Sequence, residues 1–217
     1  MKKPLINIVT RTSNRPNGFK SNVENIRNQT YDNINHVIIT DDVNSEKYIR
    51  ENGVDNYIKV DREKIIKNDK SINPNTGRYS PHNLYFNEVL DYLDEGWVLY
   101  LDDDDRFTGN NVVENIVKEI NKVDDDSLIY WRMVYSDGRF LPLDMSKDKN
   151  PILGGIGGSC FTFNVKYKHL AIWDGWKCSD YRVISKLHNN IPKKHWVPKN
   201  FIFVPSAGLG NRKDIII

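Results

Sequence analysis

The sequence predicts an α/β protein whose doubly wound, mostly parallel but mixed sheet is flanked by helices. Apolar, β-branched runs alternate with amphipathic helical segments through the first half of the chain, which is the pattern of a parallel sheet with crossover helices. Polar or acidic residues follow several of these runs, as they do at the ligand-binding edge of such a sheet. A turn between two apolar runs in the second half indicates a hairpin, so part of the sheet should be antiparallel.

The first half begins with a predicted β-α-β unit. Residues 6–12 are apolar and β-branched and form the first strand. Apolar residues at helical spacing follow as far as about residue 29, and residues 34–40 form a second strand that stops at two aspartates. A short helix that closes at Gly53 leads to a third strand at 57–60.

A long polar segment separates this unit from the centre of the chain. Residues 61–80 are rich in Lys and Asn and are too many for an ordinary connection in a compact domain, so we expect a mobile lid or a disordered segment. Residues 81–95 carry apolar side chains on one helical face, and Gly96 is a suitable stop. This helix leads to the central strand at 97–101.

The central strand runs directly into four consecutive aspartates at 102–105. Adjacent carboxylates repel one another, and a divalent ion that prefers oxygen ligands, Mg²⁺ or Mn²⁺, would relieve the repulsion. Asp102 and Asp104 share one side of an extended chain and could hold one ion together with the phosphates of a nucleotide. The alternative is a solvated acidic turn, which is how we interpret the aspartates at 124–126, because no apolar strand precedes them.

The second half of the chain departs from regular alternation. Residues 112–120 predict an amphipathic core helix, residues 128–135 and 140–143 a hairpin, and residues 201–204 a last strand. The glycine-rich turn at 154–158 is neither a Walker loop nor a dinucleotide fingerprint, since it lacks a Gly-Lys-Ser sequence and does not follow the first strand. Such a turn allows close approach to a ligand, and a plain flexible loop is the alternative.

A further helix opens at Asp180, with Ser179 as a plausible cap and an apolar face formed by Val183, Ile184 and Leu187. A carboxylate in the first turn of a helix is stabilised as the anion, which makes it a weaker base than a buried carboxylate. The position of Asp180 therefore bears directly on any role in proton transfer.

Composition excludes several classes of protein. With 217 residues, the chain is expected to form a single domain. Its 31 basic and 29 acidic residues give a net charge of +2, which does not predict binding to nucleic acid. No apolar run approaches the roughly 20 residues that span a bilayer, and no signal-peptide core follows the N-terminus, so we expect a cytoplasmic protein without a transmembrane segment.

Five motifs together resemble the nucleotide-sugar-dependent glycosyltransferases of the GT-A fold, close in style to family 2. They are the opening INIVTRTSNRPN, the strand end VIITDD, the helix before GWVLYLDDDDRF, the turn GGIGGS and the later helix at Asp180, and they occur in that family's order over nearly all of the chain. The resemblance implies one Rossmann-like GT-A domain over 1–217, with a nucleotide-binding half at 1–105 and an acceptor-binding half at 106–217.

The resemblance also implies roles for residues of the nucleotide-binding half. Thr10, Arg11 and Asp41 would lie around the nucleoside base. Asp102 and Asp103 would lie near the ribose and the phosphates of the donor.

The metal and the catalytic base follow from the same resemblance. Asp104 would be the metal's own ligand, beside Asp102, and Asp180 would occupy the place of the catalytic base. The Glu-Asp pair usual in the family is Ser179-Asp180 in this sequence, which makes Asp174 the fallback for the base. A helix cap is the structural alternative for Asp180.

Other side chains have candidate roles beside ordinary structural ones. Arg78 and Asn83 flank the end of the polar segment, where a guanidinium could grip the diphosphate, although a surface arginine is an equally good interpretation. Trp173 and Trp176 are candidates for stacking on the acceptor sugar, while core packing is the more common use of tryptophan. His195 could complete the metal shell.

These features predict a metal-dependent glycosyltransferase. It would move a sugar from a nucleoside-diphosphate sugar, with a UDP-sugar preferred on resemblance, to a hydroxyl of a glycan or other acceptor, using Mn²⁺ or Mg²⁺ as Lewis acid and a carboxylate as base. A single base without a distinct nucleophile predicts inversion of the anomeric configuration. A sugar nucleotidyltransferase and a non-catalytic nucleotide- or sugar-binding module of the same fold are the alternatives.

Overall fold

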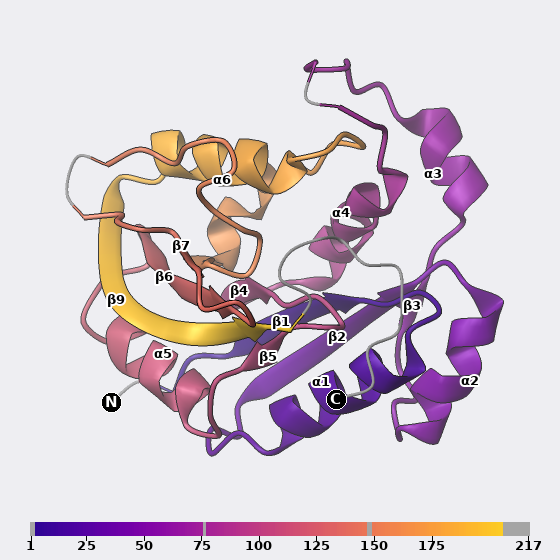
Figure 1. Cartoon of the computed structure of the whole chain (residues 1–217), viewed down its shortest axis with the longest axis horizontal. Coiled ribbons are helices and arrows are strands. Elements are labelled where there is room, and N and C mark those ends of the chain that lie inside the picture. Colours follow the sequence, from indigo (N-terminus) through magenta and orange to yellow (C-terminus); the bar gives the residue numbers. More distant parts are fainter. Residues whose placement is uncertain (1–2, 76, 147–148, 206–217) are drawn as a thin grey trace.

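A computed structural model describes residues 3–75, 77–146 and 149–205 of the chain. Its centre is one mixed β-sheet (Figure 1). In order across the sheet, the strands are β3 (Ile58–Lys59), β2 (Ile34–Thr40), β1 (Ile6–Arg11), β4 (Trp97–Tyr100), β8 (Phe161–Asn164), β6 (Ser127–Tyr135), β9 (Lys193–Val204) and β5 (Arg106–Phe107), with β7 (Phe140–Leu141) paired to β6. Strands β1 to β4 are parallel to one another, while β8 is antiparallel to both of its neighbours. The predicted mixed α/β class is confirmed.

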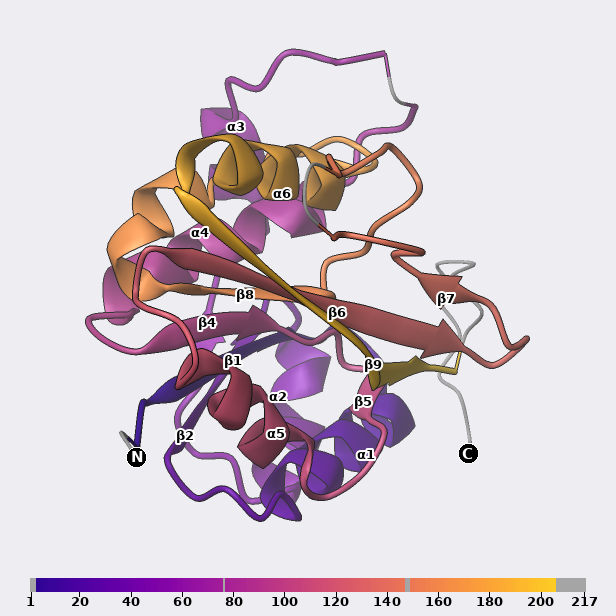
Figure 2. The same cartoon turned by 90° about the vertical axis from the view of Figure 1, so that its left-hand side faces the viewer.

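Helices cover both faces of the sheet (Figure 2). On one face lie α1 (Pro16–Arg27), α2 (Val43–Glu51) and α5 (Val112–Ile120), and on the other lie α3 (Arg62–Asn68), α4 (Tyr85–Val89) and α6 (Ser179–Asn190). Three 3₁₀ helices complete the described elements: η1 (Pro81–Leu84), η2 (Leu90–Tyr92) and η3 (Val165–Leu170). No helix in the described ranges has the length and apolar character needed to cross a membrane.

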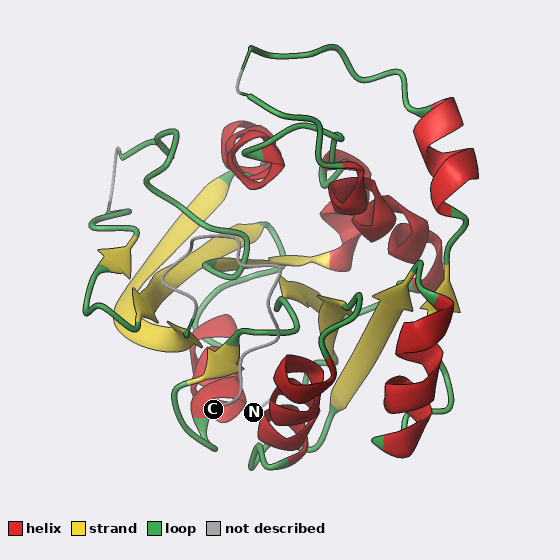
Figure 3. Ribbon diagram, turned by 45° about the vertical axis from the view of Figure 1, so that its right-hand side comes forward, coloured by secondary structure: helices red, strands yellow, loops and turns green. Residues whose placement is uncertain are grey.

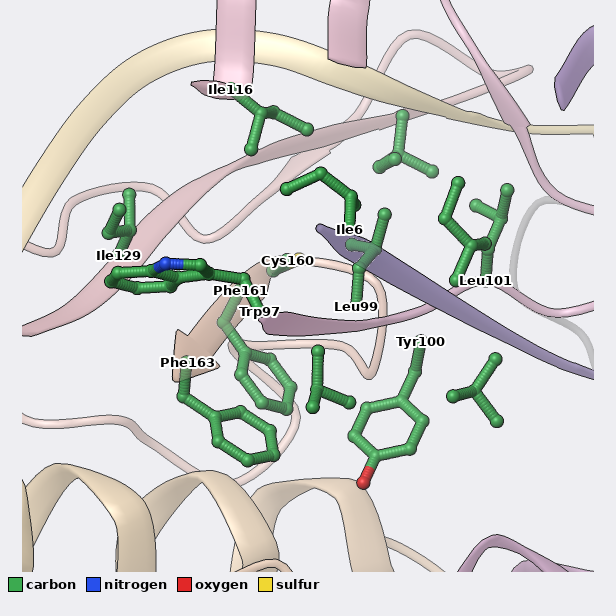
Figure 4. Close-up of a cluster of buried hydrophobic side chains, with 14 of the residues drawn as sticks. Ile6, Trp97, Leu99, Tyr100, Leu101, Ile116, Ile129, Cys160, Phe161 and Phe163 are labelled. Atoms are coloured by element: carbon green, nitrogen blue, oxygen red, sulfur yellow. The ribbon is translucent and has the colours of Figure 1, made fainter. Parts of the chain in front are cut away.

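The central strands form because both of their faces are apolar and covered. In β1, Ile6, Ile8 and Val9 are at most 1% exposed. In β4, Leu99 and Tyr100 point to opposite faces of the sheet and are both buried (Figure 4). Burial of one such side chain contributes about 1.5–3 kcal/mol. This core determines where the strands end, and therefore where the polar residues that follow them are placed.

The prediction of one continuous helix over 81–95 is wrong in detail, because the chain forms η1, α4 and η2 in succession. Tighter 3₁₀ turns are common at the ends of α-helices. The apolar face is as predicted, with Phe86 and Leu93 buried. The helical segment ends at Tyr92, so Gly96 is not its stop. Gly96 lies directly before β4 at φ +89°, where a Cβ atom would lie 2.4 Å from the Leu5 carbonyl oxygen, so only glycine is accommodated.

The polar segment at 61–80 is not structureless, because it contains α3. The Asp61 side chain accepts a hydrogen bond from the Lys64 N–H at 3.0 Å and caps this helix. Ile65 of α3 packs against the main hydrophobic core. A capped helix with an apolar contact to the core and bonds from Arg62 to Asp41 and Tyr85 thus lies in the stretch for which composition predicted a mobile lid or a disordered segment.

The loop that follows α3 extends away from the helices and returns to η1 (Figure 3). We call its described residues, 69–75 and 77–80, the tether loop. Ser80 N donates to the Gly175 carbonyl at 2.5 Å, and Tyr79 pairs with Trp176 in an isolated bridge. Gly175 is required for this approach, since a Cβ atom there would lie 2.4 Å from Cε2 of Tyr79. The end of the loop is thus fastened to the second half of the chain.

The second half of the sheet contains more strand than the sequence predicts. β8 and β5 were not expected, and β9 begins at Lys193, whereas the predicted strand covers only 201–204. Exposed polar residues and a proline at 198–200 interrupt its apolar pattern, and the pairing of β9 with β6 shifts register in the same region. The predicted hairpin is confirmed as the antiparallel pair β6 and β7.

Candidate functional site

The carboxyl ends of β1 and β4 lie beside a cavity of about 770 Å³. In open α/β sheets this edge is the usual position of a ligand site. The wall is built from segments far apart in the sequence, including the end of β1, the tether loop, η1, the turn after β4, the glycine-rich turn and the start of α6. Its polar residues are Arg11, Arg78, Ser80, His82, Asn83, Asp102, Ser159, Lys177, Ser179 and Asp180, and its aromatic residues are Phe86, Tyr100 and Trp173.

Five of the nine residues predicted to bind the donor or the metal or to act as base line this cavity together. They are Arg11, Arg78, Asn83, Asp102 and Asp180. The fold thus brings cationic side chains, one carboxylate of the acidic cluster and the candidate base to one space. The other four candidates, Thr10, Asp41, Asp103 and Asp104, are not part of the lining and are described in the next paragraphs.

Thr10 and Asp41 do not line the cavity. Thr10 is fully buried, and its hydroxyl lies 3.0 Å from Nε2 of His36. Asp41 Oδ2 accepts hydrogen bonds from the Tyr85 hydroxyl at 2.7 Å and from Nη1 of Arg62 at 3.3 Å. Asp41 Oδ1 is buried and has no hydrogen-bond partner among the described residues. Asp41 therefore keeps one acceptor that a ligand N–H could satisfy.

Arg11, the last residue of β1, connects three features of the cavity. Its Nε lies 3.0 Å from Oδ1 of Asp102, and its Nη1 donates to Oδ1 of Asn83 at 2.8 Å. Its guanidinium carbon lies 4.8 Å from the centroid of the Phe86 ring, which is within the range of a cation–π contact. These contacts fix the orientation of Arg11 while the Asp102 side chain stays 39% exposed.

Asp103 and Asp104 share a second guanidinium, that of Arg15. Nη1 of Arg15 lies 2.9 Å from Oδ1 of Asp103 and 3.1 Å from Oδ2 of Asp104. Asp103 also accepts a hydrogen bond from the Thr12 hydroxyl at 2.8 Å. Burial raises the pKa of Asp103 to about 7 although Arg15 opposes the shift, and burial raises the pKa of Asp104 in the same way.

Asp105 ends the acidic turn and is buried. Its Oδ2 accepts a hydrogen bond from the Ser159 hydroxyl at 3.0 Å, so the glycine-rich turn contacts the acidic turn directly. Burial, with the charges of the neighbouring aspartates, raises the pKa of Asp105 well above its ordinary value. Asn22 of α1 donates to the carbonyl oxygens of Asp102 at 3.1 Å and of Asp105 at 3.0 Å. The backbone of the acidic turn is thereby held against α1.

Four residues that contact the acidic turn were missed by sequence reasoning about the site: Thr12, Arg15, Asn22 and Ser159. Arg15 and Ser159 belong to the loop after the first strand and to the glycine-rich turn. Both segments were identified from the sequence, so a contact with the aspartates was open to prediction. No signal marks Asn22, because its partners are backbone carbonyls.

Asp180 is the second residue of α6 and lines the cavity. The N-cap is Cys178 in the left-handed conformation at φ +63°, not Ser179 as expected. Asp180 Oδ1 accepts a hydrogen bond from the Tyr181 N–H at 2.8 Å. Burial nevertheless raises the pKa of Asp180, and the negative charge of Asp102 adds to the effect. Its basicity is therefore greater than that of an exposed carboxylate at a helix start.

Asp174, the fallback for the base, is engaged by Arg182. Nε and Nη2 of Arg182 lie 2.5 and 2.6 Å from the two carboxylate oxygens of Asp174. Such a bidentate pair stabilises the anion. Trp173 is buried, with its ring centroid 4.7 Å from that of Phe86, whereas the Trp176 side chain is half-buried. Of the two tryptophans, Trp173 packs in the core and also lines the cavity.

His195 is engaged away from the acidic turn. It lies near the start of β9, seven residues before Ile202, which pairs with Phe107 in the strand that follows the acidic turn. Its Nε2 lies 3.0 Å from Oε2 of Glu119. The aspartates at 124–126, which we call the control cluster, lie in a solvated turn as predicted, since Asp124 is exposed and paired with Lys193.

The acidic turn offers the oxygen ligands that Mg²⁺ and Mn²⁺ prefer. The side chains of Asp102 and Asp104 are 39% and 15% exposed. Within the ranges that the structure describes, no three His, Cys, Asp or Glu side chains are grouped so that they could hold a metal ion by themselves. Mg²⁺ commonly binds through one or two carboxylates together with phosphates and water. The donor set therefore fits an ion that is bound jointly with a diphosphate.

Comparisons with protein-family models and with curated proteins find no match to this sequence. Solved structures do match. TarS from S. aureus superposes with a TM-score of 0.68 at 13% identity, over 93% of this chain and 36% of that chain. The 1–349 part of TarS in complex with UDP-GlcNAc gives 0.65 at 13% identity, over 93% and 58%. The mannosyltransferase PcManGT from Pyrobaculum calidifontis, in complex with GDP-Man and Mn²⁺, gives 0.66 at 12% identity, over 97% and 59%.

These matches concern the fold. The chain spans from 36% to 59% of the length of the three matched chains, and the sequence identities are low. Nearly the whole of this chain is nevertheless covered by each superposition. The mixed α/β architecture predicted from the sequence is therefore shared with proteins whose structures hold nucleotide sugars.

Proposed function

We propose that this chain is a GT-A glycosyltransferase, similar to family 2, that moves a sugar from a nucleoside-diphosphate sugar to a hydroxyl acceptor with Mn²⁺ or Mg²⁺. One observation carries the proposal: Asp102, the cationic Arg11 and Arg78, and the carboxylate of Asp180 line a single cavity. Its volume of about 770 Å³ lies within the roughly 300–1,000 Å³ of ligand pockets. The nucleotide sugars held by TarS and PcManGT support this class of donor.

The donor would be bound through charge and through the base. Arg78 is exposed, lines the cavity and has no ion-pair or hydrogen-bond partner for its side chain among the described residues, so its guanidinium can take two phosphate oxygens. Asn83 orients Arg11 beside it. Asp41, whose Oδ1 has no partner among the described residues, is the proposed acceptor for a base N–H, whereas Thr10 is fully buried with its hydroxyl on His36. We favour UDP because one of the matched TarS structures holds UDP-GlcNAc and another holds UDP.

Asp102 and Asp104 are the proposed metal ligands, and Asp103 lies towards the ribose. When bound, the ion would neutralise the charge that develops on the leaving diphosphate. Arg11 and Arg15 balance the remaining charge of the acidic turn. The chain's own contribution is a preorganised set of charges around the leaving group.

Asp180 is the proposed base. Its raised pKa makes it a better proton acceptor than an ordinary carboxylate, and it can take the proton of the acceptor hydroxyl as that oxygen attacks the sugar. A single base without a separate nucleophile favours inversion. The acceptor would approach along the part of the wall that the second half supplies, which includes Gly158, Ser159 and Lys177.

Substitution of Asp104 by asparagine tests the proposal. The amide lacks the charge that holds the ion, so transfer from UDP-sugars with Mn²⁺ should fall by on the order of 10²-fold or more, with an unchanged melting temperature. Asp125→Asn removes the same charge from the exposed control cluster and should leave transfer unchanged. Wild-type rates in EDTA, or an active Asp104→Asn variant, would contradict the metal site.

Two further measurements on the wild-type protein separate the alternative functions. Calorimetry with UDP and Mn²⁺ that shows binding without any transfer or donor hydrolysis would support a non-catalytic module. Consumption of a nucleoside triphosphate would support a nucleotidyltransferase. The loop after the first strand gives little support to the latter, because its cationic Arg15 is paired with Asp103 and Asp104.

A further inference from the structure

The acidic turn at 102–105 already carries cations that belong to the chain itself. Arg11 forms an ion pair with Asp102, with Nε of Arg11 at 3.0 Å from Oδ1 of Asp102. Arg15 places one nitrogen, Nη1, between Oδ1 of Asp103 at 2.9 Å and Oδ2 of Asp104 at 3.1 Å. Arg15 therefore lies on the carboxylate to which the metal ion of the proposed function would bind.

Arg15 is held in this place by the fold. It precedes Pro16, the first residue of α1, and its backbone N–H donates to the Tyr48 hydroxyl at 3.4 Å. Its side chain is 21% exposed and that of Asp103 only 4%. Partial exclusion of water strengthens such a pair relative to one on the surface. The Arg15 side chain is thus a partly buried, fixed partner of the acidic turn.

A divalent ion and this guanidinium compete for the same oxygen. A Mg²⁺ ion binds a carboxylate oxygen at about 2.0–2.1 Å, while Nη1 of Arg15 lies 3.1 Å from Oδ2 of Asp104. The two cations would be held within a few ångströms of each other and would repel strongly. The ion can bind well only if the guanidinium leaves Asp104 or if further negative charge arrives.

A diphosphate supplies both conditions. Its oxygens are ligands for the ion and also strong bidentate acceptors for a guanidinium. From this we propose that Arg15 is an internal counter-ion that keeps divalent metal off the acidic turn until a nucleotide diphosphate binds, so that metal and nucleotide enter together. The inference rests on the proposed function and adds an order of binding to it. Because coupling is reciprocal, Arg15 also makes nucleotide binding more dependent on metal.

Metal binding to the nucleotide-free protein tests this role without any activity assay. Mn²⁺ is titrated into EDTA-stripped protein without UDP, by calorimetry or by the Mn²⁺ electron-spin resonance signal. Arg15→Gln should bind Mn²⁺ at least tenfold more tightly than the wild type, because a competing charge is gone. Arg27→Gln removes the same charge from an exposed arginine at the other end of α1, which bonds the Gly53 carbonyl, and should stay within twofold of the wild type.

A purely structural role for Arg15 gives the opposite result. If Arg15 only holds the acidic turn in shape, its loss weakens Mn²⁺ binding, and Arg15→Gln then binds more weakly than the wild type. Arg15→Lys keeps the charge and should keep weak binding of Mn²⁺ alone. Wild-type protein that binds Mn²⁺ equally well with and without UDP would overturn the proposal, whether or not the variants fold.

The outcomes are separable from the test of the proposed function. Tighter Mn²⁺ binding by Arg15→Gln in a protein that transfers no sugar would leave the counter-ion role standing and remove the transferase. A wild-type protein with metal-dependent transfer whose Arg15→Gln variant gains no affinity for Mn²⁺ would leave the transferase standing and remove the counter-ion role.

Discussion

Replacement of Asp103 by asparagine should change how the stability of the protein depends on pH. Asp103 is 3% exposed, and burial raises its pKa to about 7 from an ordinary 3.8. Between these two values the folded protein holds a proton that the unfolded chain has released. Stability from this group is therefore greatest at low pH and is lost as the pH rises through this interval.

The size of the effect follows from the interval between the two pKa values. At about 1.4 kcal/mol per pH unit, ionisation of Asp103 costs the folded state about 4 kcal/mol once the pH is well above 7. About 2.5 kcal/mol of this falls between pH 5 and pH 8. Asparagine cannot ionise, so the unfolding free energy of the variant should gain about that much on the wild type across this range. The attraction of Arg15 for the ionised carboxylate is already contained in this pKa and adds no separate contribution.

The comparison with the wild type is essential because His36 has the opposite dependence. Burial lowers the pKa of His36 to about 3, so its contribution to stability is lost as the pH falls below about 6.5. The two groups partly cancel in the wild-type curve. They do not cancel in the difference between variant and wild type, since both proteins contain His36.

Urea denaturation of both proteins in EDTA, at intervals from pH 5 to pH 8, measures this difference. Asp125→Asn serves as the control, because Asp125 is exposed and its replacement removes the same charge. Its curve should run parallel to that of the wild type. Parallel curves for Asp103→Asn as well would refute the reasoning and would mean that Arg15 and Thr12 compensate the carboxylate fully.

Two further predictions concern the base and the tether loop. Asp180→Asn should lower kcat by about 10²–10⁴-fold while the Kd of UDP stays within about twofold, and NMR of the early wild-type product should show the anomer opposite to that of the donor; a normal kcat or a retained anomer would count against Asp180. Gly175→Ala should destabilise the protein by about 1–3 kcal/mol and raise the KM for donor, because its Cβ would lie 2.4 Å from Cε2 of Tyr79. Gly109→Ala is the matched control, with its nearest neighbour 3.7 Å away, and equal melting temperatures for the two variants would show that the close approach is not needed.

The parallel half of the fold was predictable because each buried strand is a continuous apolar run. Residues 34–40 form β2 with the bounds read from the sequence, and residues 112–120 form α5. The second half was less predictable because its strands depend on partners. β5 has only two residues, and the part of β9 before residue 201 contains a stretch of exposed polar residues, so neither of these carries a local signal.

The candidate site divides in the same way. The acidic turn could be identified because an apolar strand feeds it, and Arg11 because it ends another strand. The arginine on Asp104 could not be assigned, since periodicity gives no information on which of several loop cations reaches a given carboxylate. The sequence analysis considered only a divalent ion as the cation that relieves the repulsion between the aspartates. In the structure, Arg11 and Arg15 also lie beside these carboxylates.

The tether loop has a consequence for any attempt to redesign this protein by exchanging segments. Arg78 sits between two bonds to the second half of the chain, because its own carbonyl accepts from Lys177 N and Ser80 N donates to the Gly175 carbonyl. The segment that carries Arg78 and the segment that leads into Asp180 are therefore joined through their backbones. A chimera that takes residues 69–80 from another protein without also taking residues 174–177 would lose the register between the two, whereas a chimera that exchanges both together should keep it.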